Sequence, residues 1–147
     1  MFRLIVVGTD GSETASHALA QALQLAAPLG ATLDIVSAYQ PVRKARLNAE
    51  AKDAPEGYQW AINPHEDVDA TLQAAADAAV AAGVEARTHA RQGDPADAIL
   101  DVAEEHGADL IVVGNKGMTG TKRFLLGSVP NKVSHHAPCS VLIIRTT

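Results

Sequence analysis

The chain has 147 residues, 47% of them hydrophobic, which is the size and apolar content of one domain spanning residues 1–147. Its formal net charge of −5 argues against a general nucleic-acid-binding protein. Aromatic residues make up only 3% of the chain, too few for a surface on which single-stranded bases stack. Cys139 is the single cysteine, which excludes an internal disulfide and fits a reducing compartment.

Membrane classes are also disfavoured. The longest apolar runs, such as residues 110–113 and 141–144, are far shorter than the roughly 20 residues that cross a bilayer. The first residues lack the basic, apolar and cleavage regions of a signal peptide. We therefore expect a soluble, cytoplasmic protein with no membrane partner.

Charge is distributed unevenly along the chain. Residues 1–109 hold seven basic and all 17 acidic side chains, whereas residues 110–147 hold five basic side chains and no acidic one. Three of these five, Lys116, Lys122 and Arg123, cluster in one short stretch. The C-terminal quarter is therefore suited to an anionic ligand.

The first 38 residues predict a strand, a helix and a second strand. Residues 2–8 are an apolar, β-branched run of the kind that is buried on both faces of a parallel sheet. A turn follows, in which Ser12 is a good N-cap for a helix that continues to about Gly30. Residues 32–38 form the second strand.

Helices and strands continue to alternate through the rest of the chain. Asn63, Pro64 and Glu66 are typical of a helix start, and this helix should stop at Gly83. Its expected buried face consists of Val68, Leu72, Ala75, Ala79 and Val80. The remaining elements are an exposed strand over 84–90, a helix from Asp94 to about Gly107, a strand over 109–114, a helix over 129–136 and a strand over 140–144.

This alternation predicts an α/β fold: a single doubly wound, Rossmann-like domain whose parallel sheet carries helices on both faces. In such a sheet a ligand binds at the carboxyl ends of the strands, where the winding reverses. The loops after the first and fourth strands are therefore the expected site. Residues 39–62 do not fit this pattern; such a long segment is a lid, a partner surface or a disordered loop, and Trp60 within it does not decide which.

The clearest motif begins where the fourth strand ends: Gly114, two residues, Gly117, nine residues, then Gly127 and Ser128. Glycines let backbone N–H groups approach a ligand closely, and the start of a helix favours an anion. Between a strand and a helix, this pattern is typical of a loop that wraps phosphate oxygens. An ordinary surface loop with turn glycines is the alternative.

With this motif the sequence resembles the universal stress protein family, in its nucleotide-binding branch. The similarity includes residues 6–12, 110–114, 125–129 and 137–144, and it covers essentially the whole chain. The resemblance implies a five-stranded sheet ordered 3-2-1-4-5 and ATP or a related adenine nucleotide in the crevice. It also implies a homodimer joined largely through the fifth strands, here residues 139–145.

The resemblance implies roles for single residues. Thr9 and Asp10 lie on the ribose side, where Asp10 accepts from a sugar hydroxyl or helps to hold a phosphate-bound Mg²⁺. Asp10 as a simple turn residue is the alternative. Ala38 presents its backbone to the adenine edge. The implied phosphate site consists of Gly114, Lys116, Gly117, Gly127, Ser128 and Val129.

One departure from the family pattern concerns the two residues after Gly114. Family members often carry Ser or Thr and then Arg or His there, whereas this chain has Asn115 and Lys116. Lysine is a point charge where arginine offers a fork, so the phosphate count of the preferred ligand stays open. AMP and cyclic AMP are the alternatives to ATP.

The residues support binding better than turnover. The chain lacks a Gly-x-x-x-x-Gly-Lys-Ser/Thr loop, and its motif loop supplies donors but no carboxylate or histidine base. We expect a nucleotide-dependent stress or signalling regulator with no catalytic residue, at most a slow ATP hydrolase through Asp10, acting on an unknown protein partner. A nucleotide-independent dimeric interaction module is the alternative. No metal site is assigned, since the adjacent His135 and His136 point to different faces of a helix.

Overall fold

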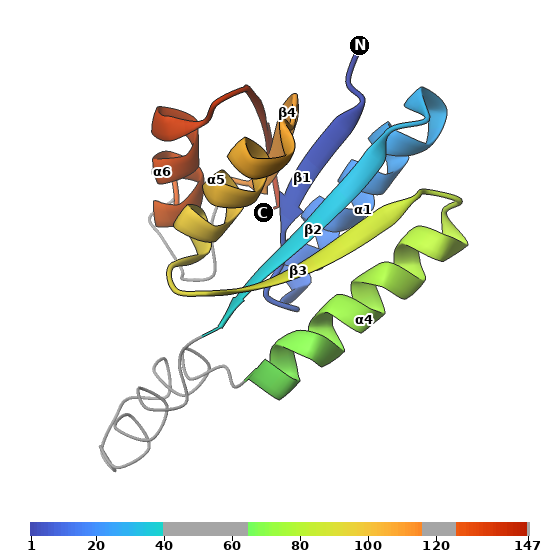
Figure 1. Ribbon diagram of the computed structural model, residues 1–147, viewed down its shortest axis with the longest axis horizontal. Coiled ribbons are helices and arrows are strands. Elements are labelled where there is room, and N and C mark those ends of the chain that lie inside the picture. Colours follow the sequence, from blue (N-terminus) through green and yellow to red (C-terminus); the bar gives the residue numbers. More distant parts are fainter. Residues whose placement is uncertain (40–64, 116–125, 147) are drawn as a thin grey trace.

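The computed structural model describes residues 1–39, 65–115 and 126–146 (Figure 1). These residues form a five-stranded parallel sheet ordered β3-β2-β1-β4-β5 with four helices, so the predicted fold class and strand order are confirmed. The elements in chain order are β1 (Leu4–Gly8), α1 (Glu13–Leu29), β2 (Thr32–Tyr39), α4 (His65–Ala81), β3 (Ala86–Gln92), α5 (Pro95–His106), β4 (Leu110–Gly114), α6 (Ser128–His136) and β5 (Ser140–Ile144).

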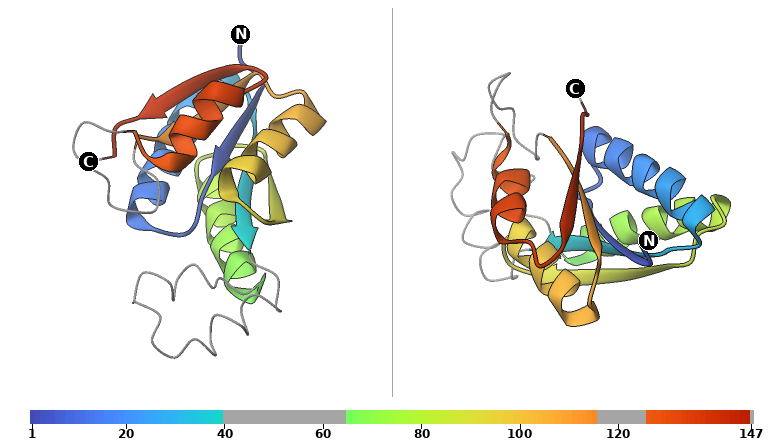
Figure 2. Two further views of the ribbon diagram at one scale, coloured as in Figure 1. Left: turned by 90° about the vertical axis from the view of Figure 1, so that its left-hand side faces the viewer. Right: turned by 90° about the horizontal axis from the view of Figure 1, so that it is seen from above.

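The sheet separates two apolar cores, because successive side chains of a strand point to opposite faces. Helices α1 and α4 cover one face of the sheet, and α5 and α6 cover the other (Figure 2). In β1, Ile5 and Val7 belong to the core under α1 and α4, whereas Val6 belongs to the core under α5 and α6. Burial on both faces explains the unbroken apolar runs of the central strands.

The predicted starts and ends of two helices are confirmed. Ser12 Oγ accepts a hydrogen bond from Ala15 N at 3.2 Å at the start of α1, which ends at Gly30 in the left-handed conformation. Asp94 caps α5 in the same way, and Gly107 ends it. Local sequence therefore fixes where these helices begin and end.

The burial predicted for one core residue is wrong. The other four residues of that stripe, spaced four, three and four apart, are buried as expected: Val68, Leu72, Ala75 and Ala79. Val80, however, is 79% exposed. Each helical residue turns by about 100°, so the residue after Ala79 lies beyond the edge of the stripe. The predicted start of this helix at Asn63 and Pro64 lies outside the described residues.

The edges of the sheet differ in character. Strand β3 begins two residues later than predicted, because Val84 N bonds the carbonyl of Ala79 and completes the end of α4. At the other edge, β5 runs over the predicted residues and leaves Leu142 and Ile143 each about 40% exposed. Residues 40–62 of the predicted loop, with Trp60, lie outside the described residues. None of the described helices combines the length and apolar composition that a membrane crossing requires.

Candidate functional site

The winding of the sheet reverses between β1 and β4. The chain proceeds from β1 to β2 on one side, whereas β4 pairs with β1 on the other. The loop that begins with Thr9 and Asp10 follows β1, Gly114 ends β4, and Ala38 lies next to the end of β2. Residues predicted from three separate parts of the sequence therefore lie together at the carboxyl ends of the strands. We call this region the crevice.

The loop after β1 is held by its own hydrogen bonds. Thr9 N donates to Val36 O at 2.9 Å, and Thr9 Oγ1 accepts from Gly11 N at 3.2 Å. Asp10 Oδ1 accepts from Ser12 N at 2.9 Å, which is the turn role considered as the alternative for this residue. The loop thus leads directly into the capped start of α1.

Gly11 is the one position of this loop that requires glycine. Its φ of 80° lies in the left-handed region, and a Cβ there would stand 3.0 Å from Oγ1 of Thr71 on α4. The loop after β1 therefore packs closely against α4.

The two ends of the glycine motif are joined through Asn115. Gly127 N donates to Asn115 O at 3.0 Å, and Asn115 N donates to Ile144 O at 2.8 Å. The Asn115 side chain points to the C-terminal segment, where its Oδ1 accepts from Thr146 N at 2.8 Å and from Thr146 Oγ1 at 3.1 Å. This departure from the family pattern therefore has a structural use. Lys116 and Gly117, like Lys122 and Arg123, lie outside the described residues.

The start of α6 differs from the starts of α1 and α5. Its N-cap is Gly127, which has no side chain to accept a bond from the first turn, and that turn carries no acidic residue. Ser128 and Val129 are the first residues of the helix. Unpaired N–H groups and the positive end of the helix dipole together favour an anion at this position.

Ser37 is a polar residue of the crevice that sequence reasoning missed. Its side chain is buried, and its Oγ has no hydrogen-bond partner among the described residues. It precedes Ala38 on β2, and strand alternation puts it on the same face as Ile35. A buried hydroxyl without a partner is uncommon and costly, so this oxygen is a candidate for a ligand contact. The sequence did offer a signal for this residue, namely a polar serine near the end of a buried strand.

The basic residues of the C-terminal quarter do not all face the crevice. Lys132 Nζ lies 2.8 Å from Asp97 Oδ1 and 3.5 Å from Asp94 Oδ2, so it pairs with the start of α5. Cys139 is half-buried, and burial followed by the carboxylate of Asp109 raises the pKa of its thiol. A raised pKa makes this cysteine a poor nucleophile.

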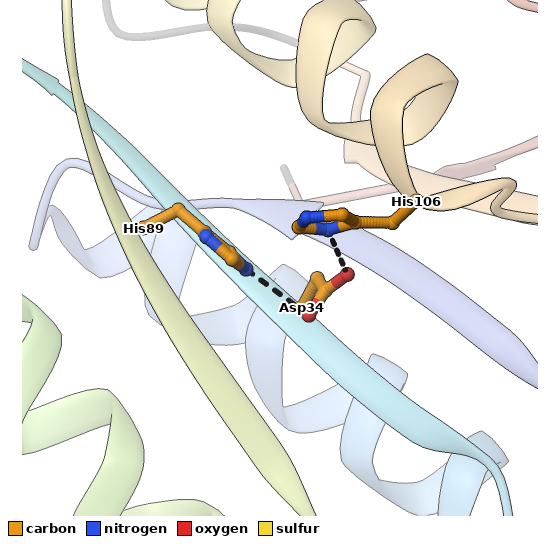
Figure 3. A group of neighbouring side chains, drawn as sticks. All are labelled: Asp34, His89 and His106. Atoms are coloured by element: carbon orange, nitrogen blue, oxygen red, sulfur yellow. Dashed lines mark hydrogen bonds and ion pairs between the residues drawn. The ribbon is translucent and has the colours of Figure 1, made fainter.

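A second polar group was missed altogether, and it lies inside the sheet. The carboxylate of Asp34 on β2 is fully buried and accepts hydrogen bonds from three side chains. These are Arg87 and His89 on β3 and His106 on α5. Figure 3 shows the two histidines beside Asp34. Burial alone would raise the pKa of Asp34, but the bonds from Arg87, His89 and His106 together hold it below its ordinary value.

Comparison with known proteins assigns the chain to a family. The sequence model of the Universal stress protein family matches residues 1–145. The chain belongs to this family. It is 38% identical over 149 residues to the universal stress protein Rv1636 of Mycobacterium tuberculosis, covering 99% of this chain and 98% of the relative. It is 36% identical over 151 residues to the universal stress protein YxiE of Bacillus subtilis, covering 99% and 100%.

Solved universal stress proteins share the fold. One, determined in complex with cAMP, superposes with a TM-score of 0.73 at 35% identity and covers 99% of this chain and 98% of its own. Another, from Archaeoglobus fulgidus in complex with dAMP, has a TM-score of 0.65 at 25% identity and covers 99% and 98%. Both superpositions cover nearly the whole of each chain.

Proposed function

We propose that this universal stress protein binds an adenine nucleotide in the crevice and acts as a nucleotide-dependent regulator of a protein partner. The observation that carries the proposal is the start of α6, which has no side-chain cap and is joined through Asn115 to the end of β4. Two related structures with bound cAMP and dAMP support the same chemistry.

The crevice divides naturally between phosphate and nucleoside. Backbone N–H groups at Ser128 and Val129 face the phosphates, together with the glycines of the motif and the charge of Lys116. Asp10 serves the ribose or a phosphate-bound Mg²⁺ through Oδ2, because its Oδ1 already accepts from Ser12 N. Thr9 lies beside it. Ala38 presents its backbone to the adenine. The hydroxyl of Ser37, for which the described part of the chain offers no partner, lies next to it on β2.

ATP is the proposed ligand, and AMP or cyclic AMP is the second candidate. The two related structures support this second candidate, because cAMP and dAMP each carry a single phosphate. Asn115 supplies no phosphate contact through Oδ1, since that atom accepts two bonds from Thr146. The charge of Lys116 is then the side-chain feature whose attraction to the ligand increases with the number of phosphates.

Regulation would act through a homodimer paired along residues 139–145. Strand β5 is an edge strand with Leu142 and Ile143 exposed on it, and an unpaired apolar edge is an aggregation hazard that pairing removes. Light scattering at micromolar concentration tests this assembly directly. A monomer would contradict it.

The binding proposal is tested by equilibrium titration of the full chain with ATP, AMP and cyclic AMP. We expect saturable binding of at least one of them with one site per chain. Binding no tighter than millimolar for all three would leave the interaction-module alternative in place. If ATP binds, multiple turnovers that disappear in Asp10→Ala would make the protein a hydrolase instead.

A charged residue introduced at the start of α6 distinguishes an effect on nucleotide binding from an effect on folding. Ser128→Asp adds a carboxylate where helices tolerate acids, so the fold keeps or gains stability. The same carboxylate repels a bound phosphate, and we expect at least about a tenfold loss of nucleotide affinity. Ser134→Asp is the matched control, because Ser134 is an exposed serine near the other end of the same helix. Equal affinity in both variants would contradict a phosphate site here.

A further inference from the structure

The cluster of Asp34, Arg87, His89 and His106, called the Asp34 cluster below, lies away from the crevice. Asp34 pairs with Val6 in the middle of β1, whereas Ala38 lies four residues further along β2. At about 3.3 Å per strand residue, the two are separated by roughly 13 Å. The cluster and the proposed nucleotide site are therefore separate in space.

The backbone positions every member of the Asp34 cluster. Arg87 is the register partner of Asp34 in the parallel β2–β3 pair, and His89 lies two residues further along the same face of β3. His106 is the last residue of α5, which packs over β2 and β3 on that side. Figure 3 shows the two imidazole rings approaching the carboxylate of Asp34 from β3 and from α5.

The possible ligand atoms of the three side chains lie close to one another. His89 Nε2 lies 3.1 Å from Asp34 Oδ1, and His106 Nδ1 lies 3.0 Å from Asp34 Oδ2. One ligand atom from each residue lies within 4.8 Å of the other two. Bonds of about 2.1 Å to a tetrahedral ion require donors roughly 3.4 Å apart, so a small inward movement of the rings completes the arrangement.

We propose that Asp34, His89 and His106 form a binding site for a divalent transition-metal ion, with Zn²⁺ as the best match. The two imidazole nitrogens favour this class of ion over Ca²⁺ or Mg²⁺, which prefer oxygen ligands, and a carboxylate oxygen is also a common ligand of Zn²⁺. Three protein ligands leave a fourth position for water. The imidazole of His106 is partly exposed, which gives the ion a path from solvent.

Binding changes the protonation of the two rings. Each ring now donates an N–H to the carboxylate of Asp34, because a carboxylate only accepts. A metal ion takes the lone pair of the same nitrogen, so the proton must move to the other nitrogen of the ring or leave to solvent. The ion therefore replaces two hydrogen bonds with three coordination bonds.

Arg87 is the competitor of the ion. Its Nε and Nη2 donate to the two oxygens of Asp34 at 2.8 and 2.9 Å, so the guanidinium and the metal ion compete for one carboxylate. The Arg87 side chain is 50% exposed and can turn into water without leaving a buried charge. Glu105, which precedes His106 and bonds Arg91, adds a negative charge near the two rings. Metal and Arg87 should accordingly be alternative partners of Asp34.

The test is a calorimetric titration of the full chain, freed of metal by a chelator, with Zn²⁺ alone. We expect one ion per chain at micromolar affinity or tighter. His89→Asn and His106→Asn should each weaken binding at least about tenfold, since even indirect partners of a metal ligand contribute that much. The double variant His135→Asn/His136→Asn is the matched control, because it removes two exposed histidines outside the cluster and should bind as the unchanged chain does.

A variant that keeps all three ligands gives a second, independent readout. Arg87→Gln removes the competing cation, so we expect a rise in Zn²⁺ affinity of at least about tenfold together with a folded circular dichroism spectrum. The proposal is overturned if the unchanged chain binds Zn²⁺ no tighter than millimolar. It is also overturned if the histidine variants bind normally, or if Arg87→Gln binds no more tightly than the unchanged chain.

Discussion

The crevice and the Asp34 cluster lie on the same sheet but are built from different materials. The crevice consists of backbone groups and small side chains at the ends of elements, such as Gly114, Gly127 and the turn after β1. The Asp34 cluster consists of charged and imidazole side chains that meet from β2, β3 and the end of α5. One site depends on where elements end, and the other depends on which residues face each other.

This difference determines how each site responds to substitution. Where backbone N–H groups form a site, changing the side chains around it costs the fold little stability, and the N–H groups that bind the ligand remain in place. A buried carboxylate with three side-chain partners contributes to stability itself, and each partner matters because the carboxylate cannot reach water. The crevice should therefore be sensitive in ligand affinity, and the Asp34 cluster in the free energy of unfolding.

The largest stability effect is expected from Asp34→Ala. The substitution removes the acceptor of Arg87, His89 and His106 and leaves a cavity under α5. We expect a loss of about 2–3 kcal/mol, kept below the value for a fully buried pair because Arg87 can be solvated. Urea denaturation measures it, and Asp77→Ala on the exposed face of α4 is the matched control, expected to stay within about 0.5 kcal/mol.

The same contribution should fade in acid. The pKa of Asp34 in the folded protein lies below its ordinary value of 3.8, so the ionised carboxylate stabilises the fold above that value. Stability is lost as the pH falls through the lower, folded-state pKa. The difference in unfolding free energy between the unchanged chain and Asp34→Asn should therefore shrink below about pH 3.8. A difference that stays constant as the pH falls well below that value would show that the charge of Asp34 does not contribute.

Most of the fold follows from local patterns in the sequence. Ser12, Gly30, Asp94 and Gly107 act within one helical turn, so their roles could be recognised without knowing the rest of the structure. The glycine motif is equally local. Val80 was predicted to be buried because residue type alone does not distinguish a hydrophobic residue beside a buried stripe from one inside it.

The Asp34 cluster could not be recognised from such patterns. Asp34 and Arg87 are 53 positions apart, and only the register of β2 against β3 places them opposite each other. A hint was available, because an acid in the middle of an apolar strand that is covered on both faces requires a partner. Which of the histidines and arginines serves it depends on strand pairing and on the docking of α5.

A substitution at Gly8 tests how tightly the two regions are connected. Gly8 ends β1 at the crevice, and a Cβ there would stand 2.5 Å from Cδ1 of Ile99 on α5, the helix that carries His106. We expect Gly8→Ala to cost about 1–2 kcal/mol through overpacking. Ile99→Val removes the clashing methyl group, so the double variant should lose less than the sum of the single losses. Simple additivity would mean that α5 moves away without resistance.

The smallest effect is expected at the joint between the crevice and the C-terminal segment. Asn115→Ala removes the acceptor of Thr146 N and Thr146 Oγ1 but keeps both backbone bonds, to Gly127 and to Ile144. We expect a loss of about 1 kcal/mol in the free energy of unfolding, with Asn131→Ala on the exposed face of α6 as the control. Nucleotide affinity should change little, because the backbone bonds still hold the two ends of the motif together. A large loss of affinity without loss of stability would instead make the Asn115 side chain part of the ligand site, contrary to its pairing with Thr146.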